Sequence, residues 1–353
     1  MKNVYLLLAL LSISVIFLNY YFYILLKKFK FFSKLKNILT LVASSILIII
    51  FFDFYIFKLF GHGFPSSISE EKLERAPTPF DMFSGKDFYN DHNSIGFRGK
   101  EFTNSNKETF QIAFFGGSTG YNGNPPIIEL VHKNLNNLDI KNRVFNFSSV
   151  SSNHNQHLHR LLKHSHLKFD LVIFYGGFNE TLQTFLYDPR PGYPFNFFIR
   201  NELSPFKYLL LKHSSILAEY EKKTGNISGV SKIKENINFQ SNDWLNLLLK
   251  NYSKTLIDSK NLSEKFINSN KCSRTKFLAF YQPISLNRSN EYSKKIITET
   301  KKFISDNNVI IDISEIIDEN EFTDSVHVSQ NAKEIIAKNI SSYIVKNNFN
   351  KCI

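Results

Sequence analysis

The sequence predicts an α/β fold in which helices cover both faces of a parallel sheet, preceded by a pair of membrane-spanning helices. Five short apolar segments show no polar alternation, and helical stretches lie between them. Unbroken apolar strands are typical of parallel sheets that are buried on both faces, and alternation of strands with helices is typical of doubly wound domains. Two long apolar runs near the N-terminus predict the membrane helices.

The first 60 residues are predicted to form a transmembrane hairpin. At 1.5 Å per residue, the apolar runs at about 4–26 and 37–60 can each cross a hydrocarbon core of about 30 Å. The loop between them, 27–36, carries five lysines, which places it in the cytoplasm by the positive-inside rule. A cleaved signal peptide is disfavoured, because the first run is too long and no small-residue cleavage site follows it. Asp53 is expected near the outer interface or facing the other helix.

The localisation that follows is a two-pass protein of the inner, or cytoplasmic, membrane. Its remaining chain then lies on the periplasmic or extracellular side. The formal net charge is +12, and residues 1–60, with seven lysines and one aspartate, supply +6 of it. Because half of the basic excess flanks the membrane, nucleic-acid binding is not needed to explain it. The two cysteines, Cys272 and Cys352, can form one bridge if this side is oxidising.

Residues 61–94 are predicted as a juxtamembrane linker, since they are rich in Gly, Pro, Ser and charge. The folded domain is predicted over 95–347. Its predicted strands are 111–115, 143–147, 170–175, 275–281 and 309–313. Its predicted helices are about 125–138, 153–167, 243–268, 289–306 and 329–346. Sites of open α/β sheets form at the carboxyl ends of strands, so side chains that follow these strands can converge.

Ser118 is the first candidate nucleophile. It stands in the glycine-rich stretch 114–122, Phe-Phe-Gly-Gly-Ser-Thr-Gly-Tyr-Asn, between a predicted strand and a predicted helix. Such a turn exposes the hydroxyl and leaves backbone N–H groups available for a developing oxyanion. Glycine-rich turns also bind phosphate or merely connect elements.

Asp324 and His327 lie on a predicted turn just before the last helix. An Asp three residues ahead of a His can fix the tautomer of the imidazole, and the His can then act as a general base. Taken alone, this spacing occurs often by chance and is more typical of a protein surface than of a catalytic site.

Four ordered blocks together resemble the SGNH/GDSL hydrolases: Gly-Gly-Ser-Thr at 116–119, Asn-Phe-Ser-Ser at 146–149, Gly-Gly-Phe-Asn-Glu at 176–180 and Asp-Ser-Val-His at 324–327. The resemblance implies a flavodoxin-like, three-layer domain. It also implies Ser118 as nucleophile, His327 as general base and Asp324 as its partner. The oxyanion donors it implies are the N–H groups of Ser118 and Ser148 and the side-chain amide of Asn179.

Three positions depart from the family pattern. Gly117 stands where Asp is common, Ser148 stands at a glycine position, and Glu180 follows the block-three Asn in place of Asp. None of these changes removes a catalytic atom, but Ser148 is expected to narrow the site. Gly117 and His154 are predicted to contact substrate.

The predicted helix 153–167 is crowded with histidines, at 154, 157, 159, 164 and 166. Positions 154 and 157 can share a face, but the sequence shows no carboxylate or cysteine that completes a site. We therefore predict no metal, and no cofactor, since neither a P-loop nor a dinucleotide fingerprint is present. The aromatic and turn-rich insertion 186–242, with a helical stretch at 206–220, is expected to form a lid or a subdomain over the core.

The sequence thus predicts a membrane-anchored serine esterase that cleaves an O-acyl ester, by preference an acetyl ester, of an envelope glycan or lipid. The alternatives left open are an O-acyltransferase that modifies a surface polysaccharide and a tethered glycan-binding or assembly protein on a degenerate hydrolase fold. The expected partners are the lipid bilayer and an acylated glycan or lipid, with no nucleic acid.

Overall fold

The computed structural model describes residues 17, 20–21, 24, 36–51, 53, 75–78, 82–85, 91–102, 108–187, 214 and 242–351. The chain divides into two compact units. One comprises residues 1–72 and 203–228, and the other comprises residues 73–202 and 229–353. The predicted insertion 186–242 is therefore shared between the two units; nearly all of it lies outside the described residues.

The first unit contains helix α2, Lys36–Phe51, whose sequence is almost wholly apolar after its first two residues. In the part of the chain that the structure describes, no helix is both long and apolar enough to cross a membrane. The predicted span 4–26 lies almost entirely outside that part. Asp53 is buried and accepts a hydrogen bond from the hydroxyl of Ser214.

The second unit opens with a hairpin that the linker prediction for 61–94 did not include. Strand β1, Arg75–Thr78, pairs antiparallel with β2, Met82–Gly85. The Pro, Gly and Ser content of this region favours a loop. β1 also contains a proline, and because Pro is confined to the edges of sheets, its presence argues against predicting a strand there.

The core of the second unit is a five-stranded sheet, as predicted, in which every pair of neighbours is parallel. Its order is β4-β3-β5-β6-β7. The strands are β3 (Phe110–Gly116), β4 (Asn142–Asn146), β5 (Leu171–Gly176), β6 (Lys276–Tyr281) and β7 (Ile311–Asp312). The chain reverses its direction of travel across the sheet between β3 and β5. That switch point is where open α/β sheets bind ligands.

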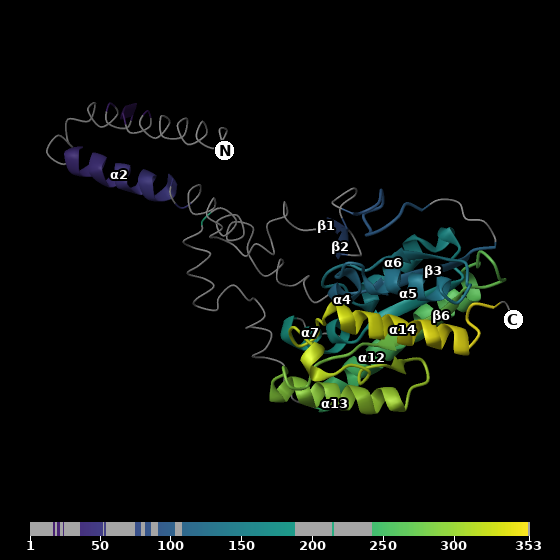
Figure 1. Cartoon of the computed structure of the whole chain (residues 1–353). Helices are drawn as coiled ribbons and strands as arrows, with labels where there is room; N and C mark the ends of the chain where they lie inside the picture. The colour runs from purple at the N-terminus through teal and green to yellow at the C-terminus, as the bar shows by residue number, and fades with distance from the viewer. Residues whose placement is uncertain are drawn as a thin grey trace. The chain divides into compact units, whose positions relative to one another are not determined.

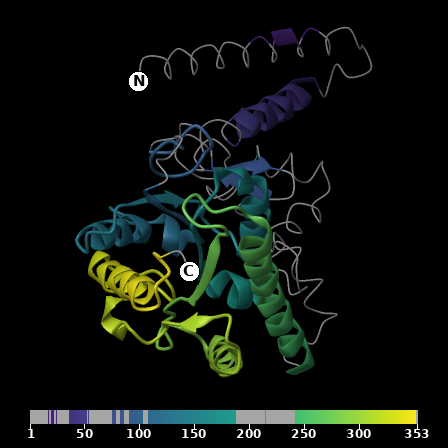
Figure 2. The same ribbon diagram turned by 90° about the vertical axis from the view of Figure 1, so that its right-hand side faces the viewer.

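Helices cover both faces of this sheet (Figures 1 and 2). The helices are α4 (Ser118–Tyr121), α5 (Ile127–Asn136), α6 (His154–Lys163), α7 (Phe178–Tyr187), α12 (Asn242–Asn261), α13 (Glu291–Ser305) and α14 (Gln330–Lys346), with short helical turns at Ser165–Leu167, Leu262–Phe266 and Glu319–Glu321. In Figure 2, α14 (yellow) lies on one side of the strands and α12 (green) on the other. The second unit is therefore three-layered.

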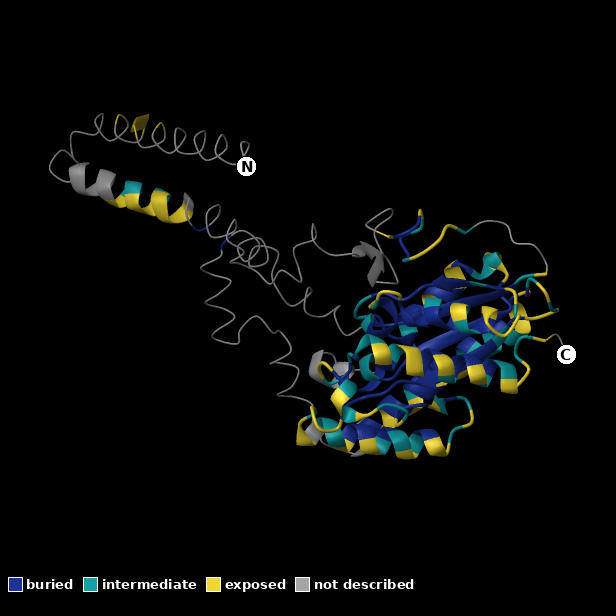
Figure 3. Ribbon diagram, viewed as in Figure 1, coloured by how far each residue is buried: buried dark blue, intermediate teal, exposed yellow. Residues whose placement is uncertain are grey.

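The two faces of the sheet follow from the alternation of side chains along each strand. In β3, Ile112 and Phe114 pack with α5 and α14, while Ala113 and Phe115 pack with α6, α12 and α13. All seven residues of β3 are buried, and the dark strands at the centre of Figure 3 show the same burial across the sheet. Two apolar layers thus clamp the sheet and fix the positions of the loops at its carboxyl edge.

The five predicted strands and the five predicted helices of this unit are confirmed, with ends shifted by a few residues. Helix α7 was not predicted, because the Gly-Gly pair that precedes it favours a turn. Cys272 is disulfide-bonded; the chain has one other cysteine, Cys352, which lies outside the described residues.

Candidate active site

Ser118 lies at the point where β3 passes into the short helix α4. Gly117, in extended conformation, is the N-cap, and its carbonyl accepts the N–H groups of Gly120 and Tyr121. As the first residue of the helix, Ser118 has no intrahelical partner for its own N–H. Within the described ranges that N–H donates to no other group. The turn thus presents a half-buried hydroxyl beside an available backbone donor.

His327 contacts the hydroxyl of Ser118. Its Nε2 lies 2.8 Å from the Ser118 Oγ, and its Nδ1 lies 2.6 Å from Oδ2 of Asp324. Because the carboxylate only accepts, Nδ1 carries the proton and Nε2 is left as an acceptor for the serine hydroxyl. Ser118, His327 and Asp324 therefore form one hydrogen-bonded chain.

Asp324 also holds the loop on which it stands. Its Oδ1 accepts the backbone N–H of His327 at 2.7 Å and that of Val326 at 2.8 Å. Partial burial opposes ionisation of this carboxyl, but these two N–H donors, together with the His327 ring, outweigh it and lower its pKa. The group is therefore ionised near neutral pH, as a partner for an imidazolium must be.

Asn179, in the first turn of α7, is placed next to the serine turn. Its Nδ2 donates to the carbonyl of Ser152 at 2.7 Å. A Cβ added to Gly117 would stand 2.4 Å from this Nδ2, so only glycine allows the amide to come this close. β3 and β5 are neighbours, so Ser118 and Asn179 stand on the two sides of the switch point.

The structure corrects the prediction for Ser148. Its N–H donates to Oδ1 of Asn146 at 3.0 Å and is not available to an oxyanion. Its side chain lies under the serine turn: Oγ is 3.0 Å from where a Cβ of Gly116 would stand and 2.7 Å from that of Gly120. Ser148 is 2% exposed, so it packs beneath the nucleophile and does not narrow the substrate space.

Ser151 lies three residues further on, in the loop between β4 and α6. Its φ of +61° is in the left-handed region that favours glycine. Its N–H makes no hydrogen bond to any residue that the structure describes. The carbonyl of the next residue, Ser152, accepts from Asn179. A serine does not indicate a positive φ in the way that a glycine does, which is why Ser151 was not predicted from the sequence.

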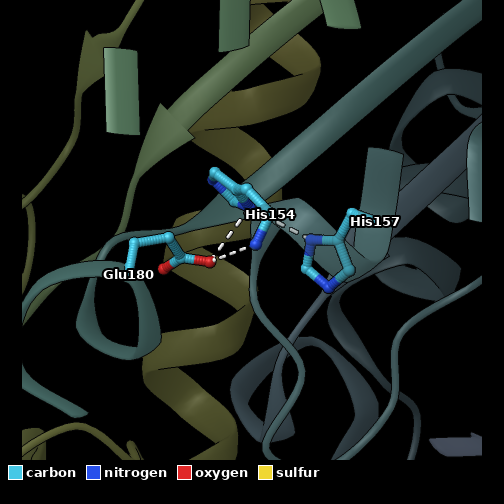
Figure 4. Close-up of side chains that lie close together, drawn as sticks. All are labelled: His154, His157 and Glu180. Atoms are coloured by element: carbon cyan, nitrogen blue, oxygen red, sulfur yellow. Dashed lines mark hydrogen bonds and ion pairs between the residues drawn. The ribbon is translucent and has the colours of Figure 1, made fainter. Parts of the chain in front are cut away.

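His154 is a second correction. It is 1% exposed and therefore does not contact substrate from an open pocket. Its ring lies between His157 and Glu180 (Figure 4). Burial lowers the pKa of His154 to about 3, and burial, with smaller contributions from His154 and Arg160, lowers that of His157. Both imidazoles are neutral, since a buried charge without compensation is costly.

Glu180 is the carboxylate that sequence reasoning did not find beside this histidine pair. It belongs to α7, whereas the histidines belong to α6, so only the fold brings them together. Burial raises the pKa of Glu180 to about 7, against the opposing effect of backbone N–H groups that it accepts, including those of Gly177 and His154.

Thr119 and Arg98 make further contacts that stabilise the serine turn. The Thr119 hydroxyl donates to the side-chain oxygen of Gln282 at 2.9 Å, which ties α4 to the end of β6. Arg98 donates to the carbonyls of Tyr121, the last residue of that helix, and Gly123, two residues beyond it, at 2.8 and 2.7 Å. Arg98 is therefore a structural residue of the turn.

No protein-family model and no curated protein matches the chain. Among solved structures, it is similar to the lipase Lip_vut3 from a goat rumen metagenome, with 14% identity and a TM-score of 0.40 over 66% of this chain and 97% of the lipase. A lipase/acylhydrolase from Enterococcus faecalis has 14% identity and a TM-score of 0.39, over 68% of this chain and 97% of the acylhydrolase. The acetylxylan esterase Axe2 from Geobacillus stearothermophilus has 12% identity and a TM-score of 0.36, over 68% of this chain and 95% of the esterase. At TM-scores below 0.5, such likeness does not by itself establish a common fold.

Proposed function

We propose that this chain is a membrane-anchored serine esterase of the SGNH type. In this proposal it cleaves an O-acyl ester, by preference an acetyl ester, of an envelope glycan or lipid. The observation that carries the proposal is the hydrogen-bonded chain from the Ser118 hydroxyl through His327 to Asp324, at the carboxyl edge of the sheet. Serine, histidine and aspartate in this order of contact form an activated nucleophile.

The first half-reaction follows from the positions of these atoms. Ser118 Oγ attacks the ester carbonyl carbon while its proton passes to Nε2 of His327. The tetrahedral intermediate carries the negative charge on the former carbonyl oxygen. His327 then gives the proton to the leaving alkoxide, the C–O bond breaks, and the acyl group stays on Ser118. The ionised Asp324 stabilises the imidazolium while it holds the proton.

The oxyanion is stabilised by donors that surround the serine turn. The Ser118 N–H and the Asn179 side-chain amide are two of them, and the Ser151 N–H takes the place expected for Ser148. Each donor of this kind contributes on the order of 3 kcal/mol to transition-state stabilisation. The Ser118 and Ser151 groups need no rearrangement to donate, since neither is committed to another described residue.

The second half-reaction returns the enzyme to its starting state. His327 removes a proton from water, the hydroxide oxygen attacks the acyl-enzyme, and Ser118 leaves with the proton from the histidine. A sugar hydroxyl in place of water would give acyl transfer by the same steps. We favour hydrolysis, because the ring of His327, with a side-chain exposure of 33%, gives water direct access to the base.

The anchoring part of the proposal rests on the apolar runs 4–26 and 37–60 and on the lysines between them. The disulfide at Cys272 agrees with a domain outside the cytoplasm, because such bonds persist in oxidising compartments. Anchoring at the membrane would keep the esterase close to acylated polymers of the envelope.

The direct test is turnover of p-nitrophenyl acetate by the purified full-length chain in detergent. Wild type is expected to release nitrophenolate, and Ser118→Ala is expected to be inactive while keeping the same circular dichroism spectrum. Equal turnover by the two proteins would contradict the proposal. If both were inactive, the tethered binding protein would be the better explanation. Mass spectrometry of acetylated glycans with and without an acceptor glycan separates loss of acetate from its transfer.

A further inference from the structure

A buried chain of polar side chains lies behind the oxyanion side of the site. His154, His157 and Glu180 are 1%, 0% and 8% exposed. Nδ1 of His154 lies 3.0 Å from Nδ1 of His157 and 3.1 Å from Oε1 of Glu180 (Figure 4). None of the three contacts the Ser118–His327–Asp324 chain directly, so the mechanism above leaves them without a task.

At one end of the chain, Glu180 joins the starts of two helices. Its Oε2 accepts the N–H of Gly177 at 2.6 Å, just before α7. Its Oε1 accepts the N–H of His154 at 2.9 Å, at the first residue of α6. Orphan N–H groups at helix N-termini favour a negatively charged partner. One carboxylate therefore ties the segment that carries Asn179 to the segment that carries Ser151 and Ser152.

At the other end, His157 reaches the loop before α6. Its Nε2 lies 2.9 Å from the Ser152 Oγ, and that hydroxyl lies 2.7 Å from the Ser149 carbonyl and 3.0 Å from the Gly116 carbonyl. Carbonyls only accept, so the Ser152 proton goes to one of them and His157 Nε2 must be the donor. His157 Nδ1 is then an acceptor and takes the proton of His154 Nδ1.

The two ends meet at Asn179. The carbonyl of Ser152 accepts from its side-chain amide at 2.7 Å, and Glu180 is the next residue in the chain. The contacts close a ring through Ser152, His157, His154, Glu180 and Asn179. One N–H of the amide is used to fix its orientation, with the nitrogen held against Gly117. The ring therefore determines where this oxyanion donor points.

The same three side chains are a possible ligand set for a divalent ion, since two neutral imidazoles and one carboxylate suit zinc. The hydrogen bonds of these side chains favour a hydrogen-bonded chain over a metal site. It satisfies both nitrogens of His157, and Glu180 already accepts backbone N–H groups with each of its oxygens. Among described residues it leaves one buried nitrogen, Nε2 of His154, without a partner.

We propose that Glu180 is a positioning residue for the oxyanion hole, which acts through Asn179 and is itself held by His154 and His157. The proposal rests on the proposed function, because it assigns Glu180 a task in the same acyl transfer. Gln in place of Glu180 keeps the size but puts an NH₂ group where one backbone N–H now donates. The NH₂ group and the backbone N–H are then two donors that face each other, so one of the hydrogen bonds that connect α6 and α7 is lost. The side chain of Asn179 is then no longer held in one orientation.

The test is a double-mutant cycle on the full-length chain, with Glu180→Gln, Asn179→Ala and the double variant assayed on p-nitrophenyl acetate. Glu180→Gln is expected to lower kcat by about 10- to 100-fold and to change KM by less than about threefold, because the lost interaction belongs to the transition state. In the Asn179→Ala background the same substitution is expected to change kcat by less than about threefold, since residues that act through one another are not additive.

Asp170→Asn is the matched control. Asp170 is also a buried carboxylate that accepts backbone N–H groups, from Gln111 and Lys271, but it precedes β5 at the opposite edge of the sheet. This variant is expected to lower the melting temperature and to leave kcat per labelled active site unchanged. If Glu180→Gln does not fold, His157→Gln breaks the other end of the ring and takes its place in the cycle.

Additive effects of the two substitutions on kcat, or a wild-type kcat in Glu180→Gln, would overturn the proposal. The esterase assignment would still stand in either case, provided that turnover by the wild type depends on Ser118. One equivalent of zinc in the purified wild type, absent from Glu180→Gln in elemental analysis, would also overturn it in favour of a metal site. If the wild type showed no turnover that depends on Ser118, both the proposed esterase function and the proposed role of Glu180 would be contradicted.

Discussion

The Oγ of Ser118 lies 2.8 Å from Nε2 of His327, although 209 positions separate the two residues. Ser118 follows the buried strand β3, and His327 precedes α14, which packs on α5 against the same face of the sheet. Hydrogen bonds from Thr323 N–H to the His327 carbonyl and from Ser285 N–H to the Ser325 carbonyl, at 2.8 and 2.9 Å, hold the histidine loop in place. The contact is therefore built on the packed core.

Replacement of His327 by Ala is expected to lower kcat for ester hydrolysis by about 10⁴- to 10⁶-fold, as lesions of such a triad do. The ring is one-third exposed, so its loss leaves no large cavity and the melting temperature should change little. Steady-state kinetics with p-nitrophenyl acetate, alongside thermal unfolding, provides the check. A decrease of less than about tenfold would be incompatible with a general base.

Asp324→Asn separates the two tasks of this residue. The Asn oxygen can still accept the N–H groups of Val326 and His327, so the loop should keep its shape. The Asn NH₂ group would face Nδ1 of His327, so the imidazole would carry its proton on Nε2. A protonated Nε2 cannot accept the proton of the Ser118 hydroxyl. We expect kcat to fall about 10⁴-fold at nearly unchanged stability. Full activity in this variant would show that Asp324 only shapes the loop.

Asn179→Ala removes a donor to the oxyanion and is expected to lower kcat by about 10²- to 10³-fold with a small effect on KM. Asn142→Ala is a suitable comparison. Asn142 is another hydrogen-bonded amide, but it stands at the start of β4, at the other edge of the sheet. That control should cost stability without reducing kcat. If both variants kept wild-type kcat, the amide of Asn179 would have no role in the chemistry.

The sequence predicted those parts of the site whose residue type is tied to their chemistry. Ser118, Asp324 and His327 could be found because they belong to four ordered blocks that together resemble a known family, and unbroken apolar strands predicted the sheet. The misassignment of Ser148 has a different origin. The N–H of Ser148 is taken by the side chain of Asn146, and local sequence specifies neither this contact nor the positive φ of Ser151.

The network behind the site could not be predicted because it depends on packing between elements. His154 and His157 share a face of α6, which the spacing shows, but their burial comes from Phe174 of β5, which contacts both rings, and from α12 beside His154. Glu180 reaches them from α7, a helix that the preceding glycines concealed. Burial and partners of a polar side chain are properties of the tertiary structure, so their chemistry emerges only there.

His164 is expected to make the fold sensitive to acid. Burial, with smaller contributions from Lys163, His166 and Arg160, lowers its pKa from 6.5 to about 4. Between these two pH values the unfolded chain binds a proton that the folded chain does not. The free energy of unfolding must therefore fall as the pH falls from about 6.5 to about 4, by at most about 3 kcal/mol from this group.

His164→Gln should remove that part of the pH dependence. The Gln side chain does not titrate, although it loses ring contacts with Phe97 and Phe147 and is expected to be less stable at every pH. Urea unfolding of both proteins at pH 8 and pH 4.5 measures the two slopes. A loss of stability on acidification that is equal in both proteins would contradict this assignment.

The proposed membrane topology makes a prediction that is independent of catalysis. Cysteine introduced at Ser33, in the lysine-rich loop, should react with a membrane-impermeant maleimide only after the cells are permeabilised. Asn287→Cys, at an exposed position of the second unit, should react without permeabilisation. Labelling of residue 33 in intact cells would contradict the proposed orientation.

The most direct test of the central claim is covalent labelling of the full-length chain with a fluorophosphonate, followed by peptide mass spectrometry. We expect one adduct, on Ser118, whose formation is strongly slowed in His327→Ala because the serine then has no base. A wild-type chain that acquires no adduct on Ser118, or a His327→Ala variant that acquires it at the wild-type rate, would contradict the claim that these two side chains act together.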